Sequence, residues 1–188
     1  MIKTLALVIA GMTQSPTMAE LERQAYVPES KYLAASPVED PTALGGFGEG
    51  GDLPSPLNGR RRVGILGPLL RFDRDGPLLV EVINTTDAAA WLPALDSKLQ
   101  MILEVLDREG RWQPAERLRA IWCGNSRHRV QLPPNHAWTY RLSTNKGPFK
   151  TKLRAKLKTE RGEVYSPPIE AAVPEHLYVL GSPPKLQR

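Results

Sequence analysis

The sequence predicts an all-β protein, an antiparallel β-sandwich of seven to eight strands. Three observations support this fold class. From residue 60 onward, short apolar or alternating segments are each ended by a turn signal. These segments recur every roughly 10 to 15 residues, a spacing typical of sandwiches. No long stretch shows the 3.6-residue period of a surface helix, and residues 88–95 hold at most a helical turn that Pro93 limits.

Each predicted strand follows from β-forming residues bounded by turn chemistry. Gly67-Pro68 is expected to stop the first strand, and Asp107 to Gly110 to reverse the chain between two later ones. In residues 138–142 aromatic and aliphatic side chains alternate with polar ones, as on a half-buried strand. Residues 150–159 and 163–173 flank a Glu-Arg-Gly turn and are expected to pair as a hairpin. The expected strands are residues 62–66, 78–84, 99–105, 111–113, 130–132, 138–142, 150–159 and 163–173.

Four turn motifs carry a resemblance to known domains. They are Asn84-Thr85-Thr86-Asp87, Asp107-Arg108-Glu109-Gly110, Leu132-Pro133-Pro134-Asn135 and Val164-Tyr165-Ser166-Pro167-Pro168-Ile169. With them, roughly residues 60–175 resemble small bacterial immunoglobulin-like or fibronectin-III-like domains, and loosely the bacterial intracellular proteinase-inhibitor family. The resemblance implies an immunoglobulin-like sandwich, and turn motifs of this kind specify a fold, not an activity. The inhibitor family implies a secreted peptidase inhibitor as an alternative function.

The first residues predict an export signal. Lys3 precedes the apolar stretch 4–12, which is too short to span a membrane but suits a signal-peptide core. Polar and helix-breaking residues follow, and Thr17-Met18-Ala19 places small residues three and one before a cut that leaves Glu20 first. We therefore expect residues 1–19 to be a signal peptide and the mature protein to be periplasmic or extracellular.

The rest of the chain divides by charge and composition. Residues 20–59 hold two basic and seven acidic side chains, are rich in Pro and Gly, and predict a disordered linker. Tyr32 and Leu33 are among its few apolar residues that could dock on a partner or on the domain. Residues 60–176 form the predicted sandwich domain, and residues 177–188 a C-terminal tail. The net charge of +5 thus conceals an acidic arm and a basic domain.

Sequence signatures of catalysis and metal binding are weak. One cysteine, Cys123, rules out a disulfide scaffold and is expected to be buried in an apolar run. Cys123 with His128 or His136 is the alternative that would make a small hydrolase, with Ser126 as a second nucleophile. The same residues lack the regular spacing of a zinc site, so we expect no metal and no cofactor. Asp73, Asp75, Asp107 and Glu109 fall in turn sequences, where carboxylates serve the backbone.

The strongest pattern is a basic stripe formed by alternate residues of one strand. Leu153, Ala155 and Leu157 occupy the intervening positions, so the cations are expected on one face and the apolar residues in the core. The stripe consists of Lys150, Lys152, Arg154, Lys156 and Lys158. Lysines on an exposed or edge strand also maintain solubility and prevent aggregation, which is the alternative explanation.

These observations predict a non-enzymatic binding module with a basic strand face. The expected partners are an anionic polysaccharide, lipid headgroups or an acidic protein segment, the chain's own arm included. We expect no aromatic residue among the cations on the outward face, and this disfavours single-stranded nucleic acid, as does export. Among the four tryptophans, Trp91 and Trp112 lie next to turns and are the expected exposed pair.

Overall fold

The computed structural model describes residues 30–43, 50–57, 59, 64–72, 77–118, 126–142 and 147–174. The predicted signal peptide, the C-terminal tail, Cys123, Asp73 and Asp75 lie outside these residues. Within them, the structure contains no helix long and apolar enough to cross a membrane.

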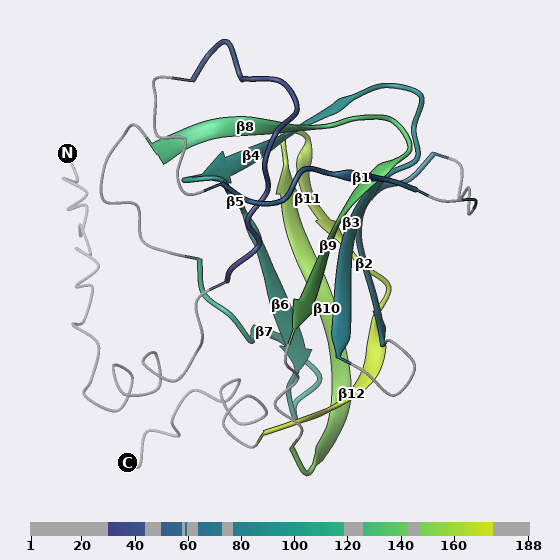
Figure 1. Ribbon diagram of the computed structural model, residues 1–188. Coiled ribbons are helices and arrows are strands. Elements are labelled where there is room, and N and C mark those ends of the chain that lie inside the picture. The colour runs from purple at the N-terminus through teal and green to yellow at the C-terminus, as the bar shows by residue number, and fades with distance from the viewer. Residues whose placement is uncertain are drawn as a thin grey trace, which may run out of the picture.

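The described residues form strands and no α-helix, so the predicted all-β class is confirmed (Figure 1). Every pairing between named strands is antiparallel. The strands are β1 (Ser55–Pro56), β2 (Leu66–Phe72), β3 (Leu78–Asn84), β4 (Ala90–Leu95), β5 (Lys98–Leu99), β6 (Met101–Leu106), β7 (Trp112–Pro114), β8 (Arg127–Leu132), β9 (His136–Leu142), β10 (Phe149–Thr159), β11 (Gly162–Tyr165) and β12 (Ile169–Val173).

These strands form three sheets around one core. The first sheet has the order β1-β9-β3-β2, the second β11-β10-β6-β7 with β12 also paired to β10, and the third β5-β4-β8. Figure 1 shows β4, β5 and β8 at one end of the molecule, above the long strands. β10 contacts β2 and β4 as well as its own sheet neighbours, so the sheets curl toward one another. Fully buried side chains from all three sheets meet between them, among them Val80, Leu92, Leu132, Trp138 and Leu157.

Asn84 connects the ends of β3 and β8 with the segment before β4 through its buried side chain. Its Nδ2 donates to the carbonyl oxygens of Ala88 and Leu132, each at 2.9 Å. Its Oδ1 accepts hydrogen bonds from the backbone N–H and the hydroxyl of Thr86. All polar capacity of the amide is therefore used within the protein, as burial requires.

Two strands lie where the sequence predicts a break or a helical turn. Gly67 and Pro68 were expected to end a strand, but both lie inside β2. β2 is the edge of its sheet, and an edge strand tolerates proline because its outward N–H needs no ladder partner. The sequence allows at most a helical turn in residues 88–95, but Ala90–Leu95 is a strand that pairs with β8 along its whole length.

The expected strand 163–173 is divided in two. β11 pairs with the last four residues of β10, and β12 pairs with its first five. Pro167 and Pro168 lie between them, and proline cannot donate to a ladder. One long strand, β10, therefore has two short neighbours on the same side.

Part of the expected disordered linker packs on the domain. Tyr32 is 1% exposed and its ring contacts that of Tyr140 edge-on at 5.2 Å. The Tyr32 hydroxyl donates to Glu116 Oε2 at 2.7 Å. Backbone hydrogen bonds join Ala34 to Ser97, and the Trp138 indole N–H donates to the Ala35 carbonyl oxygen. The buried Tyr32 ring, with its hydroxyl hydrogen-bonded, offsets part of the entropy cost of ordering this segment.

The described acidic residues of this arm do not pair with β10. Asp40 accepts hydrogen bonds from Arg129 of β8, at 2.9 Å from both the backbone N–H and Nη2. Arg129 also lies over the Trp91 ring, 5.1 Å from its centroid. The guanidinium and the other hydrogen bonds hold the pKa of Asp40 well below its usual range despite its burial. The arm therefore meets a cation, but on β8.

Candidate binding surface

The alternation predicted for residues 150–159 is present in β10. Leu153, Ala155 and Leu157 are buried, while Lys150, Lys152 and Lys158 are exposed and Arg154 and Lys156 half-buried. β10 is an interior strand, with β6 on one side and β11 and β12 on the other. The aggregation-blocking role of edge lysines therefore does not apply to it.

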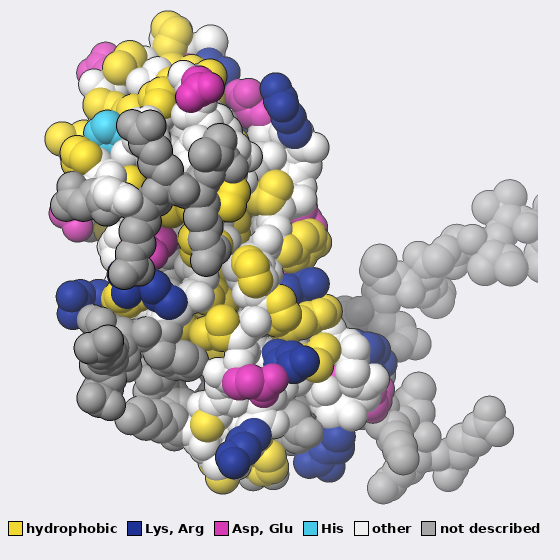
Figure 2. Space-filling model, turned by 90° about the vertical axis from the view of Figure 1, so that its right-hand side faces the viewer, with side chains coloured by type: hydrophobic (Ala, Val, Ile, Leu, Met, Phe, Trp, Pro, Cys, Tyr) yellow, Lys and Arg dark blue, Asp and Glu magenta, His cyan; other side chains and the backbone are white. Residues whose placement is uncertain are grey.

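Carboxylates from neighbouring strands neutralise part of the basic stripe. Glu104 of β6 lies 2.6 Å from Arg154 Nη2 and 3.2 Å from Lys156 Nζ. Glu163 of β11 lies 3.7 Å from Lys156 Nζ, and Glu170 of β12 lies 3.8 Å from Lys152 Nζ. Five cations and three carboxylates leave this face at +2. Figure 2 shows one side of the molecule, where basic side chains are likewise scattered among acidic and hydrophobic ones.

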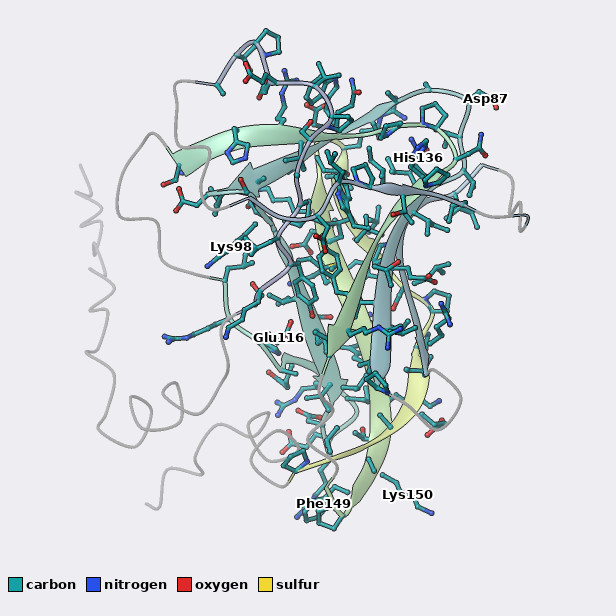
Figure 3. All side chains as sticks on the ribbon, in the orientation of Figure 1. Asp87, Lys98, Glu116, His136, Phe149 and Lys150 are labelled. Carbon is teal, nitrogen blue, oxygen red and sulfur yellow. The ribbon has the colours of Figure 1, made fainter. Side chains whose placement is uncertain are left out.

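The lysines at the two ends of the stripe are exposed. Lys150 and Lys158 make no ion pair with a described residue. Figure 3 shows Lys150 pointing away from the body of the protein at one end of β10. About 27 Å of strand separates the two lysines at the usual rise per residue. They are thus available to two separate anionic groups of a partner.

Aromatic rings enclose the central cation, contrary to the expectation that none lies among the cations. The Arg154 guanidinium carbon is 4.3 Å from the centroid of the Trp112 ring and 4.2 Å from that of Tyr165. Trp112 comes from β7 and Tyr165 from β11, opposite Lys156. An alternation within one strand cannot reveal rings supplied by its neighbours. We call this group the stacked face; it comprises Glu104, Trp112, Arg154, Lys156, Glu163 and Tyr165.

Electrostatics fix the arrangement of the stacked face. Burial opposes the charge of Lys156, but its hydrogen bond to Glu104 and the nearby carboxylates raise its pKa overall. The Tyr165 hydroxyl donates to Glu163 Oε2 at 2.7 Å. This hydrogen bond lowers the pKa of Glu163 and raises that of Tyr165. Each of these three shifts favours the usual protonation state at neutral pH: a charged Lys156, a charged Glu163 and a neutral Tyr165.

The histidines proposed for catalysis or metal binding have local roles in the structure. His128 is buried in β8, with Nδ1 3.3 Å from the Ser126 carbonyl oxygen. His136 begins β9, with Nδ1 2.8 Å from the Pro134 carbonyl oxygen. No group of three metal-ligating side chains occurs among the described residues. Cys123 lies outside those residues, so the hydrolase alternative stays a hypothesis.

The turn carboxylate Asp107 binds backbone N–H groups, as predicted. Its Oδ1 accepts hydrogen bonds from the N–H groups of Glu109 and Arg111 at 2.9 and 2.8 Å.

The two tryptophans expected at the surface, Trp91 and Trp112, are both half-buried beneath an arginine. Trp138 is a core residue, and Trp122 lies outside the described part of the chain.

No protein-family model, curated protein or solved structure matches this chain. The stacked face itself presents partly exposed aromatic rings stacked on a salt-bridged arginine, and the lysines at its two ends make no ion pair with a described residue. Such a surface offers apolar contact and charge recognition.

Proposed function

We propose that this protein is an exported, non-enzymatic binding module of immunoglobulin-like β-sandwich type, whose stacked face binds an acidic segment of another protein. The observation that carries the proposal is the position of Arg154 between Trp112 and Tyr165 over a buried carboxylate. Support for export comes from the Thr17-Met18-Ala19 pattern that follows a short apolar stretch.

The composition of the stacked face is that of a binding hot spot. Tryptophan, tyrosine and arginine are the residue types that contribute most energy at protein interfaces. Tyr165 is 45% exposed, so its ring is accessible while Arg154 covers part of it. The Arg154 guanidinium and the Tyr165 ring lose little freedom on binding, because the contacts to Glu104 and Glu163 already order them.

Charge selects an acidic partner. The ion pairs occupy Arg154 and Lys156, while Lys150 and Lys158 remain available at the rim. Charges at an interface rim act mainly on association rate and specificity, and salt screens them. We therefore expect aromatic contacts at the centre and salt-sensitive pairing with carboxylates at both ends.

Comparing an acidic polypeptide with three other kinds of anion tests the choice of partner. We would measure binding of the protein to poly-L-glutamate, heparin, phosphatidylglycerol vesicles and single-stranded DNA at several salt concentrations. The strongest binding is expected for poly-L-glutamate, with affinity that falls as salt rises. A preference for heparin, vesicles or DNA would contradict the protein-segment assignment.

A matched pair of variants separates the face from net charge. Lys150→Gln/Lys158→Gln and Lys31→Gln/Arg117→Gln each remove two exposed cations. We expect the first double variant to bind poly-L-glutamate about tenfold more weakly than the second, which corresponds to about 1.4 kcal/mol. Equal losses would mean that net charge alone attracts the polymer. Mass spectrometry of the mature N-terminus tests export, for which Glu20 is the expected first residue.

A further inference from the structure

A second surface lies between the arm and the edge of β9. A cleft of about 350 Å³ separates them, within the size range of ligand pockets. Its β9 wall consists of four consecutive residues, Ala137 to Tyr140. The side chains of consecutive strand residues point to opposite faces of the sheet. All four residues can therefore line one cleft only if the cleft runs along the edge of the strand. Leu33, Asp52 and Leu53 form the facing wall, and Ser55 lies at one end.

The edge of β9 is paired over two residues by β1. Ser55 lies opposite Ala137 and Pro56 opposite His136, and the Leu57 N–H donates to the Asn135 carbonyl oxygen at 2.7 Å. In an antiparallel ladder alternate residues face the same neighbour, so Thr139 and Arg141 direct their backbone N–H and C=O groups to the side of β1. No described strand pairs with them there. These groups can accept one further strand.

Two polar side chains of the cleft indicate which ligand groups it would bind. The Tyr140 hydroxyl is buried and has no hydrogen-bond partner among the described residues. Burial, then the negative charge of Asp52, raises the pKa of Tyr140, so its hydroxyl stays a donor. Asp52 is exposed at the cleft and makes no ion pair with a described residue. Among the described residues, the Tyr140 hydroxyl has no acceptor and the Asp52 carboxylate has no cation. A ligand that carries both groups would complement the cleft.

We propose that this cleft binds an extended peptide that adds as a strand to β9 beyond β1, with a lysine or arginine side chain paired to Asp52. The backbone groups of Thr139 and Arg141 form the ladder, and a peptide carbonyl accepts the hydrogen bond of the Tyr140 hydroxyl. Strand addition of this kind takes affinity from main-chain hydrogen bonds and specificity from side-chain pockets. The residues involved are distinct from the stacked face, so each proposal is testable without the other.

The test uses three peptides and amide signals of the full mature protein. The peptides are acetyl-Thr-Val-Lys-Val-Thr-amide, its norleucine counterpart at the central position, and a form N-methylated on alternate amides. Titration into ¹⁵N-labelled protein is expected to shift the Thr139 and Arg141 amide signals with the lysine peptide. The norleucine peptide should bind about tenfold more weakly, as expected for loss of a charge-assisted hydrogen bond. The N-methylated peptide should not bind, because its ladder donors are blocked.

Protein variants assign the roles of the two side chains. Asp52→Asn is expected to abolish the difference between the lysine and norleucine peptides, whereas Asp87→Asn, an exposed carboxylate between β3 and β4 that does not line the cleft, should preserve it. Tyr140→Phe should weaken both peptides and leave the free protein as stable or more stable, because an unpartnered buried hydroxyl is removed. The proposal is overturned if the Thr139 and Arg141 amides do not shift, or if the lysine preference survives in Asp52→Asn.

Discussion

Arg154 donates from both Nε and Nη2 to the same Glu104 oxygen, at 2.7 and 2.6 Å. Glu104 is 5% exposed although its side chain lies on the outward side of its sheet, because Arg154 and Lys156 cover it. One buried carboxylate thus fixes two cations of the neighbouring strand. It also positions the guanidinium on which the Trp112 and Tyr165 rings stack. The same ion pair therefore stabilises the sheet and shapes the stacked face.

Removing the charge of Glu104 is expected to destabilise the protein. Glu104→Gln leaves the half-buried Arg154 without its counter-charge, and it leaves the half-buried Lys156 with the more distant Glu163, 3.7 Å away. We expect the free energy of unfolding to fall by about 2 kcal/mol in urea titrations. The matched variant Glu170→Gln, at an exposed pair 3.8 Å apart, should cost less than about 1 kcal/mol. Equal effects of the two variants would show that Glu104 has no special role.

The Asp40–Arg129 pair is expected to make stability depend on acid pH. The pKa of Asp40 in the folded protein lies below its unfolded value of about 3.9. Its stabilisation is therefore fully present above that value and is lost as pH falls toward the folded pKa. Asp40→Asn should cost about 2 kcal/mol at pH 7, and its difference from wild type should shrink below about pH 4. A difference that stays constant from pH 7 to pH 3 would contradict this account.

Tyr32 tests whether the arm is an integral part of the fold. Tyr32→Ala removes a ring that is 1% exposed and should cost about 3–5 kcal/mol in thermal or urea unfolding. Val38→Ala, in the same arm but 49% exposed, should change stability by less than about 0.5 kcal/mol. If Tyr32→Ala were as mild as Val38→Ala, residues 30–43 would be a weakly held linker, as their composition suggests.

Gly147 lies too close to β12 to tolerate a side chain. A Cβ at this position would approach the carbonyl group of Val173 to 2.1 Å. Gly147→Ala is therefore expected to destabilise the protein by about 1–3 kcal/mol, because backbone must move to admit it. Gly50→Ala, where a Cβ meets nothing within 4 Å, is the control and should be neutral. Comparable melting temperatures for both variants would be the contrary result.

Local patterns in the sequence predict much of the fold but little of the surface. The two-residue period of β10 predicts which of its residues face the core, and the Asp107 turn is equally local. The partners of Arg154 are not local: Glu104 is 50 positions away, and Trp112 and Tyr165 come from two other strands. The order of strands in the sheet decides these contacts, and the sequence of a single strand does not predict that order. The sequence marks Tyr32 as a residue that could dock on the domain or on a partner, but a single aromatic in a Pro-rich arm shows no period that would say which.

The most direct test of the stacked face is photo-crosslinking in the organism that produces the protein. Tyr165→p-benzoylphenylalanine places a reactive group beside Arg154, and Val38→p-benzoylphenylalanine places it at an equally exposed position in the arm. Our account predicts one discrete protein adduct from position 165, attached through an acidic segment and lost when Trp112→Ala is added. No protein adduct at position 165, or the same adduct from position 38, would contradict it.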